Sequence, residues 1–124
     1  MTRAARSVFV FSIYLFVLGG VLVVVPNALL AVFRIPPTGE VWIRVAGMLV
    51  ILLGYYYSGA ARREMTDFFR WTVVARTSVL LFFVAFVLLG FAPPVLILFG
   101  VVDAAAAGWT ALALRSEVAQ SGSA

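Results

Sequence analysis

Three ionisable residues interrupt long apolar stretches of this sequence, and they are the side chains that could do chemistry. Arg44, Arg76 and Asp103 each lie inside a separate run of roughly 20 mostly apolar residues. If such a run crosses a bilayer, an ionised side chain near its middle costs about 2.5–3.5 kcal/mol, so it needs a partner, a route to water or a function. These residue types permit an interhelical Arg–Asp pair, a ligand or ion site, or a proton-transfer site.

Other residue types needed for common chemistry are absent from the sequence. There is no cysteine and no histidine, and all nine basic residues are arginine. Thiolate or imidazole metal sites, haem ligation by His or Cys, disulfides, histidine-based acid–base catalysis and lysine Schiff bases therefore cannot be built from this chain. We predict no metal and no cofactor, assign no catalytic residue, and favour a protein that is not an enzyme.

The composition indicates an integral membrane protein. Of 124 residues, 65% are hydrophobic and 11% are charged, with a mean hydropathy of +1.14. A water-soluble fold of this length needs more charge to cover its surface. The formal net charge is +4, but the arginines lie near the ends of apolar runs, which favours contact with the lipid bilayer and no nucleic-acid partner.

The apolar runs predict an all-α fold, a single polytopic membrane domain over residues 1–124 built as a four-transmembrane-helix bundle. A helix needs roughly 20 apolar residues to cross the hydrocarbon core. Pro26 and Asn27 close the first run, a charged link at 62–70 separates the second from the third, and residues 28–33 are expected at the interface. The predicted spans are about 8–25, 41–61, 71–91 and 95–114, followed by a polar C-terminal tail at 115–124.

The distribution of arginine predicts the orientation, because basic residues beside short loops stay in the cytoplasm. Only Arg34 lies in the loops of the opposite side. We therefore expect a multi-pass membrane protein with both termini in the cytoplasm. The arginines on the cytoplasmic side are Arg3, Arg6, Arg62, Arg63, Arg70 and Arg115.

The three ionisable residues are expected at different depths in the bilayer. At 1.5 Å per residue, Arg44 lies about 5 Å below the outer surface, Arg76 about 8 Å above the inner one and Asp103 about 13 Å below the outer one. An arginine this close to an interface is expected to extend its guanidinium into the headgroups. Asp103 is too short to do so, which leaves pairing with either arginine, protonation, or a water-filled cavity.

Small residues predict where helices approach each other, because dispersion contacts between backbones hold membrane helices together. In the second span Gly47 and Gly54 are seven residues apart, and Arg44 lies on the same face as Gly47. In the fourth span Gly100, Ala104 and Gly108 form a stripe beside Asp103. We predict that these five small residues are helix-packing positions.

Four short segments carry a family resemblance over nearly the whole chain. They are WIRVAG at 42–47, FRWTVVAR at 69–76, LFGVVD at 98–103 and GWTALALR at 108–115. With the four spans, they resemble small bacterial membrane proteins of the DoxX-like group. The resemblance implies an inner-membrane four-helix bundle from a group sometimes associated with quinone-linked or thiol redox systems. Without cysteine or histidine, this chain cannot carry such redox work itself.

The length and number of spans are also similar to those of the small multidrug exporters. Those proteins depend on a membrane-embedded glutamate in the first span. Residues 8–25 contain no acidic residue, which counts against drug–proton antiport.

Two functions of different classes remain open, and a third ranks last. The first is a structural or accessory membrane subunit in which Asp103 and an arginine fix the packing. The second is a small-molecule or lipid-binding or transport bundle, with Asp103 and Arg44 in an intramembrane cavity. The possible protein partners are a second copy of the chain and a membrane partner subunit. An enzyme acting on an isoprenoid or quinone ranks last, because only Asp, Tyr and Arg are available to it.

Overall fold

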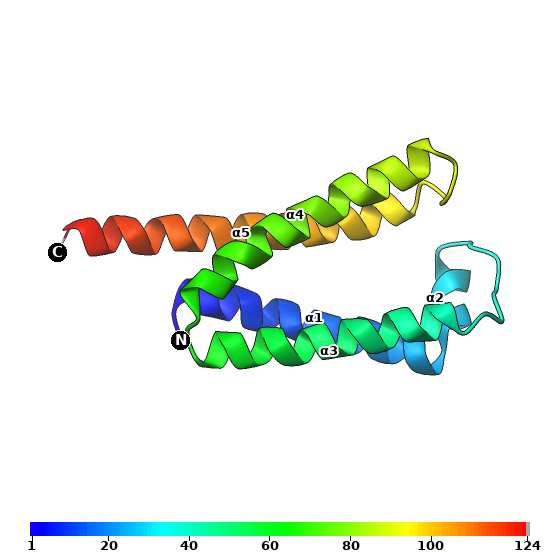
Figure 1. The fold of residues 1–124 in the computed structure, drawn as a ribbon, viewed down its shortest axis with the longest axis horizontal. Helices are drawn as coiled ribbons and strands as arrows, with labels where there is room; N and C mark the ends of the chain where they lie inside the picture. Colours follow the sequence, from blue (N-terminus) through cyan, green and yellow to red (C-terminus); the bar gives the residue numbers. More distant parts are fainter. Residues whose placement is uncertain (124) are drawn as a thin grey trace. The chain divides into compact units, whose positions relative to one another are not determined.

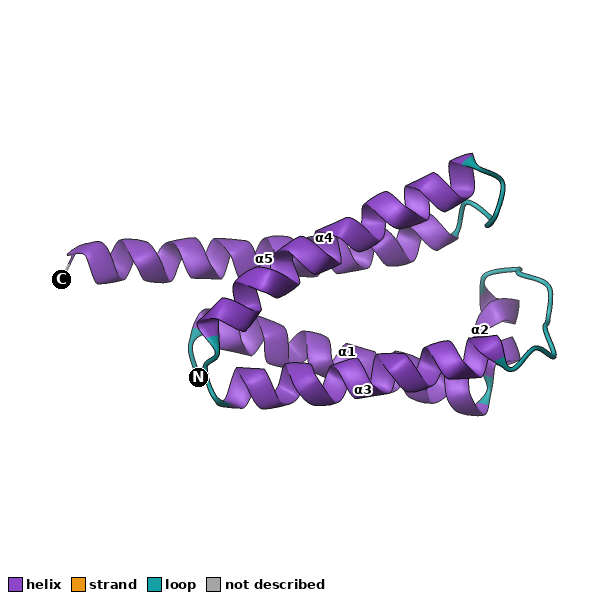
Figure 2. Cartoon of the chain, in the orientation of Figure 1, coloured by secondary structure: helices purple, strands orange, loops and turns teal. Residues whose placement is uncertain are grey.

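The chain folds into five α-helices joined by short loops (Figure 1). The computed structural model describes residues 1–123, with side chains through Ala119, and Figure 2 shows only helices and loops in this part of the chain. In chain order the helices are α1 (Arg3–Val24), α2 (Pro26–Val32), α3 (Trp42–Arg62), α4 (Thr66–Leu88) and α5 (Leu96–Ser123). The predicted all-helical fold is confirmed.

Four of these helices are long and apolar enough to cross a membrane: α1, α3, α4 and the Leu96–Ala119 part of α5. No more than 33% of any of the four spans is buried inside the chain. Large apolar side chains such as Val17, Leu81 and Leu112 are exposed. Surfaces of this kind need lipid or another protein to cover them, and the length and hydropathy of the four helices are compatible with a membrane helix bundle.

The boundaries of α4 differ from the predicted span of 71–91. The helix begins at Thr66 because the second half of the charged link forms its first turn, where the Asp67 carboxylate interacts favourably with the positive end of the helix dipole. It ends at Leu88 because Gly90 takes a positive φ of 80°. The Phe91 N–H then donates to the Phe86 carbonyl at 2.8 Å, a hydrogen bond that closes a Schellman-type end.

The helices at the two ends of the chain are longer than the sequence analysis predicted. The first helix begins at Arg3 rather than at residue 8, and the last continues to Ser123 rather than ending at Leu114. Arg, Glu, Ala and Gln fill much of the predicted tail, and all four favour helix over coil. The polar tail is therefore helical as far as Ser123.

The chain divides into two compact units. Phe9–Gly59 forms one unit and holds most of α1 and α3, all of α2, and the loop that follows α2. Met1–Val8 and Ala60–Ala124 form the other, in which α4 and α5 lie side by side (Figure 1).

Glycines bring α1 and α3 together in the Phe9–Gly59 unit. A Cβ on Gly47 would lie 2.7 Å from the Leu22 Cβ and 2.9 Å from the Gly19 carbonyl oxygen. Nearer the other end of the pair, the rings of Phe11 and Tyr57 are 5.8 Å apart. The two helices are therefore antiparallel, and their closest approach admits no side chain at Gly47.

The start of α1 belongs to the other unit, where two carboxylates cap it. Thr2 Oγ1 accepts a hydrogen bond from the Ala5 N–H at 3.1 Å, and Glu117 Oε1 accepts one from the Ala4 N–H at 3.0 Å. Glu64 accepts from the Thr2 N–H at 2.8 Å and from the Thr2 hydroxyl at 2.7 Å. These bonds satisfy amides that a helix start leaves without intrahelical partners.

Candidate functional site

The most deeply buried charged side chain is that of Arg76, in the middle of α4. Only 2% of it is exposed. Its Nε donates to the Thr72 carbonyl oxygen at 3.2 Å, one helical turn earlier. Its Nη2 donates to Thr72 Oγ1 at 3.0 Å and to Thr110 Oγ1 of α5 at 2.9 Å. The expectation that Arg76 extends to the membrane surface is wrong, because the protein itself encloses the guanidinium.

Thr110 extends this network to a third helix. Its Oγ1 lies 2.6 Å from Ser7 Oγ, and Ser7 Oγ donates to the Ala4 carbonyl oxygen of α1 at 2.7 Å. Ser7 and Thr110 are completely buried. We call Arg76, Thr72, Thr110 and Ser7 the arginine–hydroxyl cluster. It joins α4, α5 and the first turns of α1.

The local sequence explains how the cluster forms. Thr72 and Arg76 are four residues apart, so both project from the same face of α4. Phe69, which is also buried, continues this face one turn earlier. On α1, the small buried residues Ala4 and Ala5 flank the cluster's Ser7 in the chain. Small side chains of this kind let helices approach closely.

The cluster has little capacity for acid–base chemistry. Arginine stays protonated in proteins, and a hydroxyl needs an adjacent base before it can act as a nucleophile. None of the four members is a base that accepts a proton near neutral pH. A buried guanidinium surrounded by hydroxyl and carbonyl oxygens is instead suited to holding helices together, since charge-assisted hydrogen bonds are stronger than neutral ones.

Asp103 lies near this cluster without joining it. It is half-buried on α5, seven residues before Thr110, and thus on the same side of the helix. Among the side chains described, those through Ala119, its carboxylate has no hydrogen-bond or salt-bridge partner, and Arg76 is the charged residue that interacts with it electrostatically. Of the two partners considered for Asp103, Arg76 is the one in the same unit, and it acts through space.

Arg44 belongs to the other unit and has a different role. Its Nη1 donates to the carbonyl oxygens of Val23 and Val24, at the end of α1. Pro26 has no N–H, and the Ala28 N–H bonds to Val25, so neither restores regular helical bonding to the α1 end. The exposed arginine caps these carbonyls, an interaction that the helix dipole also favours. It also lines a shallow, otherwise apolar groove of about 390 Å³ between α1 and α3.

The predicted helix-packing residues divide into two groups. Gly47, Gly54 and Gly100 are buried, and added Cβ atoms would lie 2.7 Å from Leu22, 3.3 Å from the Ser12 carbonyl and 2.9 Å from the Leu80 Cα, respectively. Ala104 is half-buried beside Asp103. Gly108 is exposed and has nothing within 4 Å of an added Cβ. Close packing of the α5 stripe is therefore found at Gly100 and not at Gly108.

Sequence reasoning missed the hydroxyl members of the cluster. The four-residue spacing of Thr72 and Arg76 was visible in the sequence, as was the seven-residue spacing of Asp103 and Thr110. Ser7 gave no such signal, because its contact with Thr110 joins residues 103 positions apart. The capping role of Arg44 was also missed. The signal for it was Pro26, which has no N–H to donate to a carbonyl at the end of α1.

Comparison of the chain with protein-family models, with curated proteins and with solved structures found no match. Over residues 1–123, no group of three or more His, Cys, Asp and Glu side chains is placed to hold a metal ion.

Proposed function

We propose that this chain is a four-span protein of the bacterial inner membrane that acts as a structural or accessory membrane subunit, with both termini in the cytoplasm. The observation that carries the proposal is the burial of Arg76 in the arginine–hydroxyl cluster. Among the residues whose side chains are described, the most deeply buried charge thus joins α4, α5 and the start of α1.

The chemistry of the other arginine in a predicted span supports the same role. Arg44 donates to backbone carbonyls at the end of α1, so its hydrogen bonds stabilise a helix end. Arg76 likewise donates through Nε and Nη2 to protein oxygen atoms. The DoxX-like resemblance, carried by the four sequence segments, and the arginine distribution between the loops support the inner-membrane location and orientation.

A second candidate function is binding or transport of a small molecule or lipid. The observation that favours it is Asp103, a half-buried acidic residue in a span that makes no hydrogen bond or salt bridge among the residues whose side chains are described. An acidic side chain in this position is suited to a cationic ligand or an ion.

Thermal unfolding of purified variants in detergent tests the two candidates. We expect Arg76→Gln to lower the unfolding temperature strongly, because it removes the charge that holds three helices. Arg63→Gln makes the same change of charge at an exposed position and should leave that temperature almost unchanged. An Arg76→Gln variant as stable as the parent would contradict the structural role.

Asp103→Asn distinguishes the second candidate. The parent and this variant are compared for stabilisation by quinones, cationic amphiphiles and lipids. The structural role predicts the same response in both proteins for every compound. If one compound class stabilises the parent and not Asp103→Asn, the binding function replaces the structural one.

A further inference from the structure

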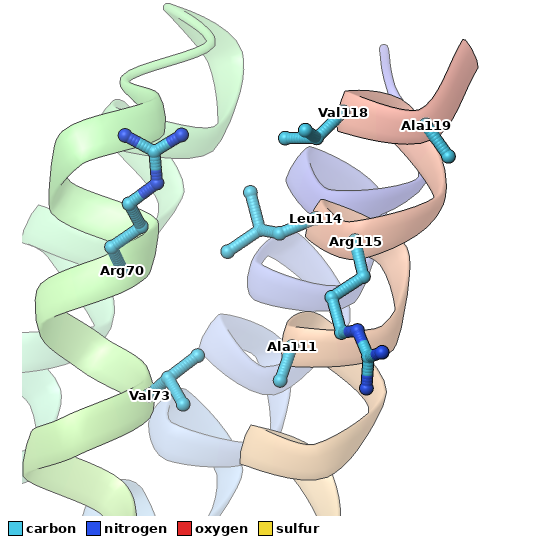
Figure 3. A pocket seen from close by; sticks show the side chains of 7 residues that line it. All are labelled: Arg70, Val73, Ala111, Leu114, Arg115, Val118 and Ala119. Carbon is cyan, nitrogen blue, oxygen red and sulfur yellow. The ribbon is translucent and has the colours of Figure 1, made fainter. Parts of the chain in front are cut away.

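A groove between α4 and α5 combines apolar walls with two arginines at one end of the helix pair. It has a volume of about 480 Å³ and lies wholly within the unit that contains both helices. Figure 3 shows Val73 of α4 and Leu114 of α5 pointing into it, with Arg70 and Arg115 at its edges. The remaining lining residues are Ala111, Val118 and Ala119.

The positions of the two arginines match the depth of lipid phosphates. Arg70 directly precedes the apolar run that begins at Trp71, and Arg115 directly follows the apolar run that ends at Leu114. Both arginines therefore lie where an apolar stretch ends, at the same end of the antiparallel pair. Long arginine side chains at this depth reach the headgroup region.

Both arginines are available to an incoming anion. Their side chains are exposed, and the bond of Arg70 to Asp67 is a 3.5 Å surface ion pair. Exposed pairs of this kind contribute little stability and exchange readily. Among the described residues, Arg115 has no ion-pair partner. In Figure 3 the two guanidinium groups point in different directions, so the side chains must turn before both can contact one phosphate.

We infer that this groove binds one anionic phospholipid, with an acyl chain along Val73, Ala111 and Leu114 and the headgroup phosphate held by Arg70 and Arg115. The inference rests on membrane insertion and not on the accessory role. A lipid is the occupant that the chemistry favours, because apolar walls and phosphate-binding groups meet at interface depth. Basic pockets between helices on the cytoplasmic side are suited to acidic headgroups.

Native mass spectrometry of the full chain in detergent tests the site directly. Phosphatidylglycerol or phosphatidylcholine of matched acyl chains is added at increasing ratios. We expect one phosphatidylglycerol to remain bound to the parent at ratios where phosphatidylcholine does not. Arg70→Gln with Arg115→Gln should weaken that binding by about tenfold or more.

Two further variants separate the groove from general surface charge. Arg3→Gln with Arg63→Gln removes the same charge from exposed positions outside the groove and should leave binding within about twofold. Ala111→Phe fills the groove without changing charge and should weaken binding by at least about tenfold, with helicity by circular dichroism confirming the fold.

Four results would overturn the inference. The first is equal loss of binding in the control pair, which would mean general attraction to a basic surface. The second is unchanged binding in Ala111→Phe, which would mean that the groove holds no chain. The third is displacement of phosphatidylglycerol by millimolar glycerol phosphate, which would mean that a free phosphate suffices. A dimer carrying no lipid would show instead that a second copy covers the groove.

Discussion

Arg44 and Arg76, the two arginines inside predicted spans, donate hydrogen bonds to different kinds of oxygen atom. Arg76 has hydroxyl and carbonyl oxygens around it inside the protein, whereas Arg44 has the carbonyl oxygens at the end of a helix. In both cases protein oxygen atoms accept hydrogen bonds from part of the guanidinium. An arginine in a membrane helix therefore need not mark a ligand site, provided that backbone or hydroxyl oxygens lie within reach.

Arg44→Gln should loosen the end of α1. Loss of a cap at a helix C-terminus costs about 1 kcal/mol, which corresponds to roughly fivefold more frequent local opening. Hydrogen–deuterium exchange in detergent should therefore become about fivefold faster at residues 21–25 and stay unchanged in α5. Arg34→Gln, at an exposed loop position, is the control. Unchanged exchange at residues 21–25 would show that the Arg44 bonds do not cap the helix.

The carboxylate of Glu64 gives the α1 start a dependence on pH. The hydrogen bond from the Thr2 hydroxyl is the main cause that lowers the pKa of Glu64 below its ordinary value of 4.5. A lowered pKa in the folded state means that the stabilisation is complete above pH 4.5 and is lost as the pH falls through the folded value.

Glu64→Gln should consequently lower the unfolding temperature at pH 7, and the difference from the parent should shrink below about pH 4.5. Thermal unfolding between pH 7 and pH 3.5 measures this. Glu40→Gln removes a carboxylate from an exposed loop position and should show no such trend. If the difference in unfolding temperature between Glu64→Gln and the parent grew as the pH fell, the ionised carboxylate would not be the group that caps α1.

At the scale of the helices, apolar run length correctly predicted four helices that are long and apolar enough to cross a membrane. The ends were less well predicted, since they depend on local backbone details. Gly90 ends α4 through its positive φ, and Asp67 lets the charged link become the first turn. Neither effect changes hydropathy, so counting apolar residues could not detect it.

The sequence predicted the charged residues of the candidate site but not their partners. A charge inside an apolar run is visible in the sequence, and this identified Arg44, Arg76 and Asp103. Their partners were not visible, because Ser7, Thr110 and the Val23 carbonyl come from other helices. Only the helix pairing in the folded chain specifies which oxygen atoms lie near each guanidinium.

Gly47→Ala should destabilise the contact between α1 and α3. The new Cβ would lie 2.7 Å from the Leu22 Cβ and 2.9 Å from a backbone oxygen, so the helices must separate. Overpacking of this kind costs about 1–3 kcal/mol. Gly20→Ala is the matched control, because an added Cβ there has nothing within 4 Å. Alanine favours helix, so the control should be neutral or slightly more stable. Equal unfolding temperatures of the two variants would contradict the packing.

At the scale of the whole molecule, the proposed orientation places both termini in the cytoplasm. The chain has no cysteine, so single cysteines introduced at Gly39 and at Ser123 can be labelled without background. In intact bacterial cells, a membrane-impermeant maleimide should label Gly39→Cys, and it should reach Ser123→Cys only after permeabilisation. The opposite labelling pattern would show that the C-terminus lies outside the cytoplasm. Labelling of both cysteines in intact cells would also contradict the proposed orientation.

Arg76 links α4 to α5 through its hydrogen bond to Thr110. A double-mutant cycle measures the coupling free energy between these two side chains. Unfolding free energies are compared for Arg76→Met, Thr110→Val and the double variant, with Arg76→Met and Thr77→Val as the control cycle. Thr77 is an exposed hydroxyl of α4 that donates to the Val73 carbonyl at 2.7 Å. The account predicts a coupling of about 1–2 kcal/mol for the first cycle and none for the control. Additive effects of Arg76→Met and Thr110→Val would contradict it.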